Sequence, residues 1–482
     1  MGNYYPLPIA CFLLACLAIL VFSKRVAALR TLTMASFCGV YLISFTGGTT
    51  GAIWLVEAFL VLFGVAFLSR RQRPALASRL STRLLYGLFT IYGIEILVGF
   101  IRYDASIATI KSGSYGVIGG IPLPVLMAAY RLFVLTCLYF AFTVPLKCSI
   151  TRDDLTRCLA TCWFGAIILA VAGLVDYFGI ANMAFTRSRE VGYEHDSMLG
   201  FYRGTHGLML YSGLVMSFAL TQSTRSIASK SIVFASMPLL ILALLLTWSR
   251  SSVVALTVAC IVLTVTLGGT RALKGLTLGL LGFTIIFAAL AQLPDIQKRY
   301  TDWFSASLAE GSGGRVENWI YILNWLASHP DALVFGMGFQ NFNYTVHAIS
   351  GATELTGAHN SYLHILTECG ITGLVMLCAW IAATAHWAIS WRRTAQDSTT
   401  RTLACTFAAY LLGLSVAGIT EESLLPSRTF VPICLFMLMF TGIFISYYRT
   451  TASMGIQAAF YVDSSRHNDS VVAAPMPGTL QT

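Results

Sequence analysis

Long apolar runs recur along the chain as far as about residue 447, and they constrain the fold more than any other feature. Each run has about 16–21 residues, which suits a helix that crosses a bilayer and exceeds the length of a membrane-spanning strand. Only 11% of the residues are charged, against about 25% in a soluble domain. We therefore predict an all-α fold, a polytopic transmembrane bundle of about 12–13 helices. The expected spans are residues 7–23, 31–46, 52–68, 84–101, 125–145, 158–178, 207–222, 231–247, 252–269, 275–292, 373–391, 403–419 and 429–447.

Basic residues gather in short clusters in every second connecting loop, and by this count of spans all of these clusters fall on the same side of the membrane. The net charge of +10 is therefore spread over loops that face anionic lipid, and it does not indicate a nucleic-acid partner. By the positive-inside rule the basic side is cytoplasmic, and the N-terminus then lies outside. No basic residue precedes the first run, so we interpret that run as a retained span and not as a cleaved signal.

The predicted outer side carries two long loops, residues 179–206 and 293–372. The second is too long for a simple connector, and we expect it to contain short helices and to carry the function. Its apolar residues from Val316 to Leu326 recur at helical spacing, which predicts an amphipathic helix on the membrane or against the bundle.

These features divide the chain into four parts. A polar tail follows the last span, and its lack of an apolar pattern predicts disorder. The expected parts are N-terminal transmembrane helices at 1–200, a core at 201–373 with the loop 293–372, C-terminal transmembrane helices at 374–450, and a disordered cytoplasmic tail at 451–482.

The end of the longer outer loop contains the strongest candidate for a catalytic group. His359 precedes a short helical pattern that Asn360 or Ser361 can cap and that Gly370 ends. The positive potential at a helix N-terminus disfavours a protonated imidazole, and a neutral imidazole can act as a general base. The alternative is a polar loop residue beside a cap. We expect His364 to pack on the same short helix.

Three arginines on the outer side lie in settings that suit an anion. Arg250 lies in a sharp turn between two spans. Arg315 follows the small residues 311–314, and Arg203 precedes Gly204, so backbone N–H groups can approach an anion closely at both places. Arginine forms bidentate contacts with phosphate, and the set indicates a lipid-linked diphosphate. The alternatives are a side chain that reaches the lipid headgroups at Arg250 and a flexible linker at Arg315.

Three further charged residues, Glu57, Glu95 and Arg131, lie within predicted spans. A buried ion at that depth is costly unless it is paired, so a structural ion pair is favoured over a role in substrate binding. The sequence contains no zinc, nucleotide or dinucleotide motif and predicts neither a metal nor another cofactor. Guanidinium groups can instead stabilise a leaving diphosphate.

The order of these motifs resembles that of the O-antigen ligase and Wzy-type polymerase family, over residues 201–373. The segment HNSYLHILTECGITG is similar to the family's histidine motif, TWSRSS to its Ser-Arg turn, and residues 313–342 to its Arg…Trp…Pro…Gly-x-Gly segment. The matching positions are Arg203, Arg250, Arg315, Trp319, Pro330, Gly336, Gly338, His359, Asn360, Gly370 and Gly373.

This resemblance implies a glycosyltransferase of the bacterial inner membrane, with a GT-C-like helical bundle and a periplasmic site. The implied donor is an undecaprenyl-diphosphate-linked oligosaccharide, and no metal or other cofactor is implied. In such an enzyme His359 would be catalytic. Diphosphate binding would fall to Arg203, Arg250 and Arg315, with Asn360, Gly370 and Gly373 in support.

Members of this family differ in their acceptor. Polymerases join one lipid-linked repeat to another, and ligases transfer the glycan to lipid A-core. The length of the chain favours a polymerase of O-antigen or exopolysaccharide, with a chain-length regulator as a candidate partner and the ligase as the alternative. A flippase for lipid-linked oligosaccharides is the non-enzymatic alternative, and it predicts charges along the bundle interior and not on one face.

Overall fold

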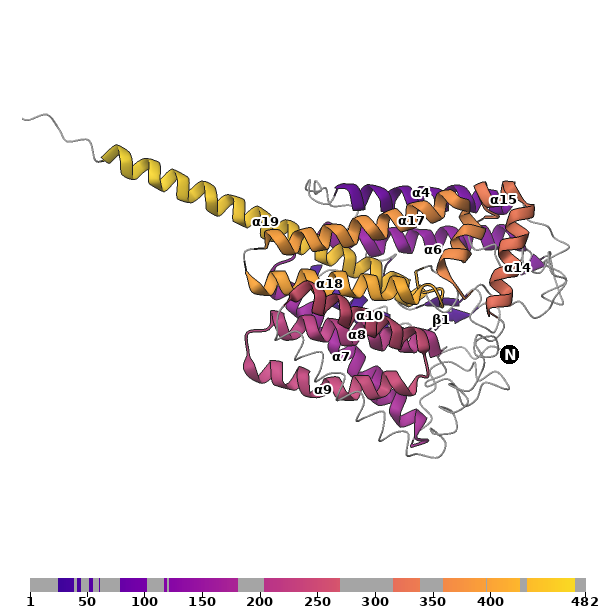
Figure 1. The fold of residues 1–482 in the computed structure, drawn as a ribbon, viewed down its shortest axis with the longest axis horizontal. Helices are drawn as coiled ribbons and strands as arrows, with labels where there is room; N and C mark the ends of the chain where they lie inside the picture. The colour runs from indigo at the N-terminus through magenta and orange to yellow at the C-terminus, as the bar shows by residue number, and fades with distance from the viewer. Residues whose placement is uncertain are drawn as a thin grey trace, which may run out of the picture.

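The computed structural model describes residues 25–38, 41–44, 52–54, 60, 79–101, 117–118, 121–180, 203–268, 315–338, 359–395, 397–424 and 431–472. Nearly all of these residues are helical (Figure 1). The helices are α2 (Arg25–Cys38), α4 (Arg79–Ile101), α6 (Leu123–Leu146), α7 (Arg152–Tyr177), α8 (Arg203–Ser223), α9 (Ile227–Leu246), α10 (Arg250–Leu267), α14 (Arg315–Ser328), α15 (Pro330–Phe335), α17 (Ser361–Thr394), α18 (Ser398–Ala417) and α19 (Val431–Val472).

Among the described residues, eight helices are long and apolar enough to cross a membrane, which confirms the predicted helical bundle. They are α4, α6, α7, α9, α10, α17, α18 and α19. The predicted span 207–222 is helix α8, which is buried along almost its whole length between the other helices. The predicted spans 7–23 and 275–292 lie outside the described residues.

The prediction of one helical span over residues 31–46 is wrong. Helix α2 ends at Cys38, and strand β1 (Tyr41–Ser44) pairs antiparallel with β2 (Ala52–Trp54), at the start of the predicted span 52–68. Aromatic and β-branched residues favour these strands, and the glycine-rich sequence between them favours a turn. A second short hairpin pairs β3 (Val117–Ile118) with β4 (Ile121–Pro122).

Helix α19 passes through the bundle and continues beyond it to Val472 (Figure 1). It therefore includes the first part of the segment for which we expected disorder. No glycine or proline occurs between Gly455 and Pro475, so no residue of either kind interrupts the helix there.

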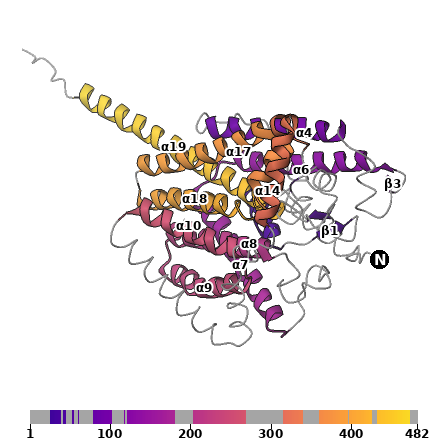
Figure 2. The ribbon, with the colours of Figure 1, turned by 45° about the vertical axis from the view of Figure 1, so that its right-hand side comes forward.

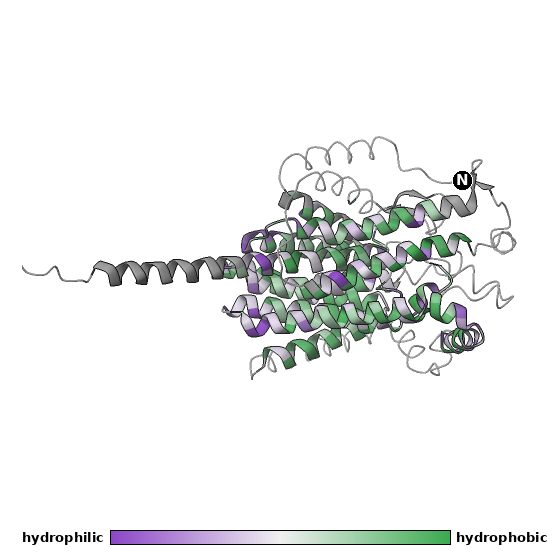
Figure 3. Cartoon of the chain, turned by 90° about the horizontal axis from the view of Figure 1, so that it is seen from above, coloured by the Kyte–Doolittle hydropathy of each residue, from purple (hydrophilic) through white to green (hydrophobic). Residues whose placement is uncertain are grey.

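The two ends of the bundle differ in their residues. At one end, named here the Arg152 end, Arg152 Nη2 donates to Ser223 O at 3.3 Å and to Thr399 Oγ1 at 3.4 Å, which joins the starts of α7 and α18 to the end of α8. Figure 3 shows apolar colouring along most of each helix and hydrophilic residues mainly toward the helix ends. Described members of the predicted cytoplasmic clusters at the Arg152 end include Arg79, Arg83, Lys147, Arg152, Arg157, Arg225, Lys230, Arg392, Arg393 and Arg401.

The opposite end, named here the His359 end, holds the segment that the sequence marks as functional. Ser361 N donates to Gly418 O at 2.7 Å, so α17 begins where α18 finishes. Helix α14 runs across the bundle direction at this end (Figure 2). The bundle therefore carries the basic clusters at one end and the candidate site at the other.

The amphipathic helix predicted in the long loop is α14. Its buried side chains, Ile322 and Leu326, pack with Ala332 of α15 and Leu366 of α17. We expected this helix to lie either on the membrane or against the bundle, and its buried face packs against the bundle. The residues predicted for the apolar stripe also include Val316, Ile320 and Leu323, which are 40%, 55% and 47% exposed and so form a second, open stripe.

Candidate functional site

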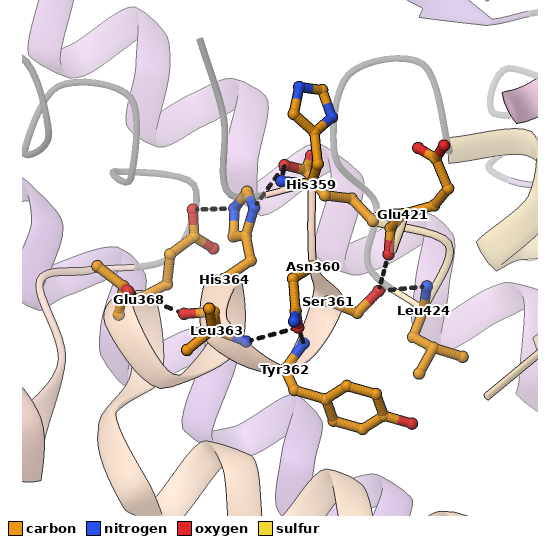
Figure 4. A network of polar contacts seen from close by, with 11 residues as sticks. His359, Asn360, Ser361, Tyr362, Leu363, His364, Glu368, Glu421 and Leu424 are labelled. Carbon is orange, nitrogen blue, oxygen red and sulfur yellow. Dashed lines mark hydrogen bonds and ion pairs between the residues drawn. The ribbon is translucent and has the colours of Figure 1, made fainter. Parts of the chain in front are cut away.

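Asn360 is the N-cap of α17. Its Oδ1 accepts hydrogen bonds from the backbone N–H groups of Tyr362 at 2.9 Å and Leu363 at 3.1 Å (Figure 4). These N–H groups lie in the first turn and have no partner within the helix, and a cap of this kind contributes about 1 kcal/mol. The sequence allowed either Asn360 or Ser361 as the N-cap, and the structure shows that it is Asn360.

His359 has a backbone conformation that is rare for a residue with a side chain. Its φ is 45°, in the left-handed region, and such strain costs of order 1–3 kcal/mol. The His359 N–H donates to Glu422 Oε1 at 3.3 Å. Figure 4 shows its imidazole directed away from His364 and Glu368. The ring is therefore not part of the polar cluster that holds its backbone.

A short segment after α18, residues 418–424, is hydrogen-bonded to the start of α17. Ser361 N donates to the carbonyl oxygens of Gly418 at 2.7 Å and Glu421 at 3.2 Å. Ser361 Oγ donates to Glu421 O at 2.9 Å and accepts from Leu424 N at 3.2 Å. Because Ser361 is completely buried, these bonds satisfy polar groups that water cannot reach. We call residues 418–424 the post-α18 segment.

Arg315, the first residue of α14, contacts the same segment. Its Nη1 donates to Thr420 O at 2.8 Å, and its Nη2 lies 3.7 Å from Glu421 Oε1. The guanidinium is thus attached to residues 420–421, while the backbone of His359 is attached to Glu422. The structure brings Arg315 and His359 together through three consecutive residues.

Arg203 and Arg250 begin two helices whose first turns pack together. A β-carbon on Gly207 would lie 2.4 Å from Ser252 Oγ and 2.7 Å from Ser249 Cβ, much closer than van der Waals contact. This close approach requires glycine at 207. The starts of α8 and α10 are therefore neighbours, with Arg250 exposed at the end of the predicted sharp turn.

Helix α8 is aligned with α18 so that Arg203 lies at the His359 end. Tyr211 Oη donates to Tyr410 O at 2.8 Å. Tyr211 lies about two helical turns after Arg203, and Tyr410 lies about two turns before Gly418. The backbone at Arg203 and the post-α18 segment therefore lie at the same level of the bundle. All four predicted site residues belong to this end.

His364 packs on the short helix, as expected, and it also contacts Glu422 outside that helix. Its Nε2 lies 2.8 Å from Glu368 Oε1, and its Nδ1 lies 3.3 Å from Glu422 Oε1. The His364 and Glu368 side chains are buried, with 6% and 2% of their surface exposed. Each nitrogen of the ring thus faces a carboxylate, as buried charge requires.

The sequence prediction missed three acidic residues that contact the site residues at this end: Glu368, Glu421 and Glu422. One local signal was present, because Glu368 follows His364 by one helical turn, where side chains meet. A second was the adjacent pair of acidic residues between two apolar runs. Neither signal shows which basic groups these acids contact, since Arg315 and His359 lie far away in the sequence.

Gly370 interrupts α17, as predicted, with φ of 64° and a kink at that point. The carbonyl groups freed there accept from another loop: Met337 N donates to Thr367 O at 2.9 Å, and Gly338 N donates to Glu368 O at 3.0 Å. A β-carbon on Gly370 would lie 2.2 Å from Val334 O. The backbone at the kink therefore binds the residues at and just after the end of α15. This contact positions α14, and with it Arg315, across the end of the bundle.

The other glycines of these motifs also allow close contacts. A β-carbon on Gly336 would lie 2.3 Å from Glu368 O, and one on Gly373 would lie 2.4 Å from Cys369 Cβ. Glu95 and Arg131 are both buried; Glu57 lies outside the described residues. Within the described part of the chain, no cluster of three or more histidine, cysteine or acidic side chains could hold a metal ion.

A family model described as O-antigen ligase matches residues 235–378. Over this region the chain is similar to the O-antigen ligase family. The match runs from within α9 to a point in α17 just after the kink at Gly370. It contains Arg250, Arg315 and His359. Arg203 and the post-α18 segment lie outside it. No curated protein matches the chain. The match confirms the resemblance that the motifs predicted, and the eight apolar helices fit a multi-pass membrane protein.

Proposed function

We propose that this protein transfers a glycan from an undecaprenyl-diphosphate-linked donor to a sugar hydroxyl, most directly as a polymerase of O-antigen or exopolysaccharide repeats. The observation that carries the proposal is the attachment of Arg315 and His359 to consecutive residues of the post-α18 segment. One cation and one potential base are thereby fixed at the same end, where Arg203 and Arg250 also lie. A lipid-linked diphosphate suits this arrangement because its charge stays at the membrane surface.

The proposed reaction is a direct displacement at the anomeric carbon. His359 accepts the proton of the acceptor hydroxyl as the oxygen attacks that carbon. The bond between the carbon and the diphosphate oxygen breaks, and the diphosphate leaves with the electron pair. Arg203, Arg250 and Arg315 stabilise the charge that develops on it. Guanidinium groups supply the positive charge in this mechanism, and a good leaving group needs no separate acid.

The orientation of the site is part of the proposal: the His359 end faces the periplasm of a bacterial inner membrane. It rests on the separation of the basic clusters at the Arg152 end from the candidate site. We expect a cysteine at exposed Glu317 to react with an impermeant thiol reagent in intact spheroplasts, and a cysteine at exposed Arg393 to react only after lysis. The reverse pattern would place the site in the cytoplasm.

The acceptor can be identified from the product that a deletion strain loses. If the protein is a polymerase, the deletion strain should carry single repeats and no long chains. The single repeats should still reach their usual acceptor, because ligation continues. The ligase alternative predicts lipid A-core without any O-antigen, while polymer accumulates on the lipid carrier. If the deletion leaves both glycan lengths and attachment unchanged, neither form of the proposal holds.

A flippase is the remaining alternative from another class. The charges at the His359 end favour an enzyme, although Glu95 and Arg131 are buried within helices of the bundle. The two functions differ in their products, because a flippase moves the donor without releasing free undecaprenyl diphosphate. Release of that product by the purified protein would exclude transport as its sole activity.

A further inference from the structure

The contacts of His359 hold its backbone in place, and their importance for catalysis rests on the proposed function. The backbone of His359 is left-handed, with φ of 45°. A residue with a β-carbon adopts this conformation only where its surroundings determine it. Asn360 and Ser361 fix the chain on one side through the cap and the post-α18 segment. On the other side, the His359 N–H is bonded to the Glu422 carboxylate.

Glu422 is itself held by a buried network. The same Oε1 atom that accepts from His359 N lies 3.3 Å from His364 Nδ1. The opposite nitrogen of His364 lies 2.8 Å from Glu368. The Glu422 side chain is 12% exposed, so little water competes for it, and its contacts are stronger than at an open surface. The carboxylate therefore joins the interior of α17 to the backbone of His359.

We propose that Glu422 is a positioning residue for catalysis by His359. Its carboxylate fixes the left-handed backbone, which directs the imidazole away from His364 and Glu368 (Figure 4). A base must meet its hydroxyl within hydrogen-bond reach, and a displacement of about 1 Å can lower a rate by about 10²-fold. Glu422 does not contact the reacting atoms in this role. It belongs neither to the motifs of the sequence nor to the matched family region.

The test compares Glu422→Ala with Glu422→Gln in purified protein. Glutamine keeps an oxygen that can accept from His359 N–H, and alanine removes it. We expect Glu422→Ala to lower kcat by about 10²-fold while the Kd for undecaprenyl diphosphate stays within about three-fold, because the arginines bind the phosphates. Glu422→Gln should recover most of that kcat. The matched control is Glu317→Gln, which removes an exposed carboxylate at the same end and should leave kcat unchanged.

Three results would overturn the positioning role. Glu422→Ala could retain its kcat, glutamine could fail to rescue a folded protein, or both variants could lose diphosphate affinity and thermal stability together with kcat, as a merely structural residue would. The double variant His359→Gln with Glu422→Ala separates this inference from the proposed function. If Glu422 acts through His359, the second substitution adds little to the first. An active His359→Gln variant would instead contradict the proposed function itself.

Discussion

Replacing Arg250 or Arg315 with alanine is expected to lower glycan transfer by about 10²–10³-fold, the usual cost of removing one donor that stabilises a developing negative charge. Both residues would bind the diphosphate, and both lie at the His359 end. Lysine should rescue poorly, because it keeps the charge but loses the planar pair of donors that matches a phosphate. The measurement is the rate of glycan transfer by purified protein from a defined lipid-linked donor.

Arg250 gives the cleaner result of the two. Arg315 is bonded to Thr420 O, so its removal can also disturb the post-α18 segment, whereas the Arg250 side chain is exposed. Arg157→Ala is the matched control, an exposed arginine at the Arg152 end, and it should keep full activity. Full activity in Arg250→Lys would show that the residue only anchors the protein to lipid headgroups.

Local sequence signals predicted the parts of this site that depend on neighbouring residues. The turn at Arg250, the cap at Asn360 and the break at Gly370 follow from short-range rules on caps, turns and glycine, and all three are present. The amphipathic repeat of α14 was likewise visible. Apolar length alone misled at residues 31–46, where glycines and β-forming residues replace a single helix with a helix and a strand.

The tertiary partners of the site could not be predicted in the same way. Glu422 lies after α18, and its contacts with His359 and His364 form only when α17 and α18 pack side by side. The left-handed backbone of His359 is also set by these partners, because a histidine in isolation does not favour it. A single sequence shows which residues are charged, but it does not show which of them are in contact in the folded protein.

His359→Ala and His359→Gln are expected to lower the rate of transfer by about 10²–10⁴-fold, the contribution of a positioned general base. Undecaprenyl diphosphate should still bind to both variants, since its contacts are with the arginines. The control is His329→Gln, an exposed histidine at the same end whose ring stacks on Trp325, and it should retain activity. Near-normal turnover by His359→Gln would reduce His359 to a positioning or cap-adjacent residue.

The anomeric configuration of the product tests the central claim most directly. Purified protein would receive an undecaprenyl-diphosphate donor of defined anomeric configuration and a defined acceptor, and NMR couplings would report the configuration of the new linkage. Direct displacement assisted by one base predicts inversion, with one free undecaprenyl diphosphate released for each bond formed. Retention of configuration would contradict the account, because it requires two displacements through a glycosyl-enzyme intermediate.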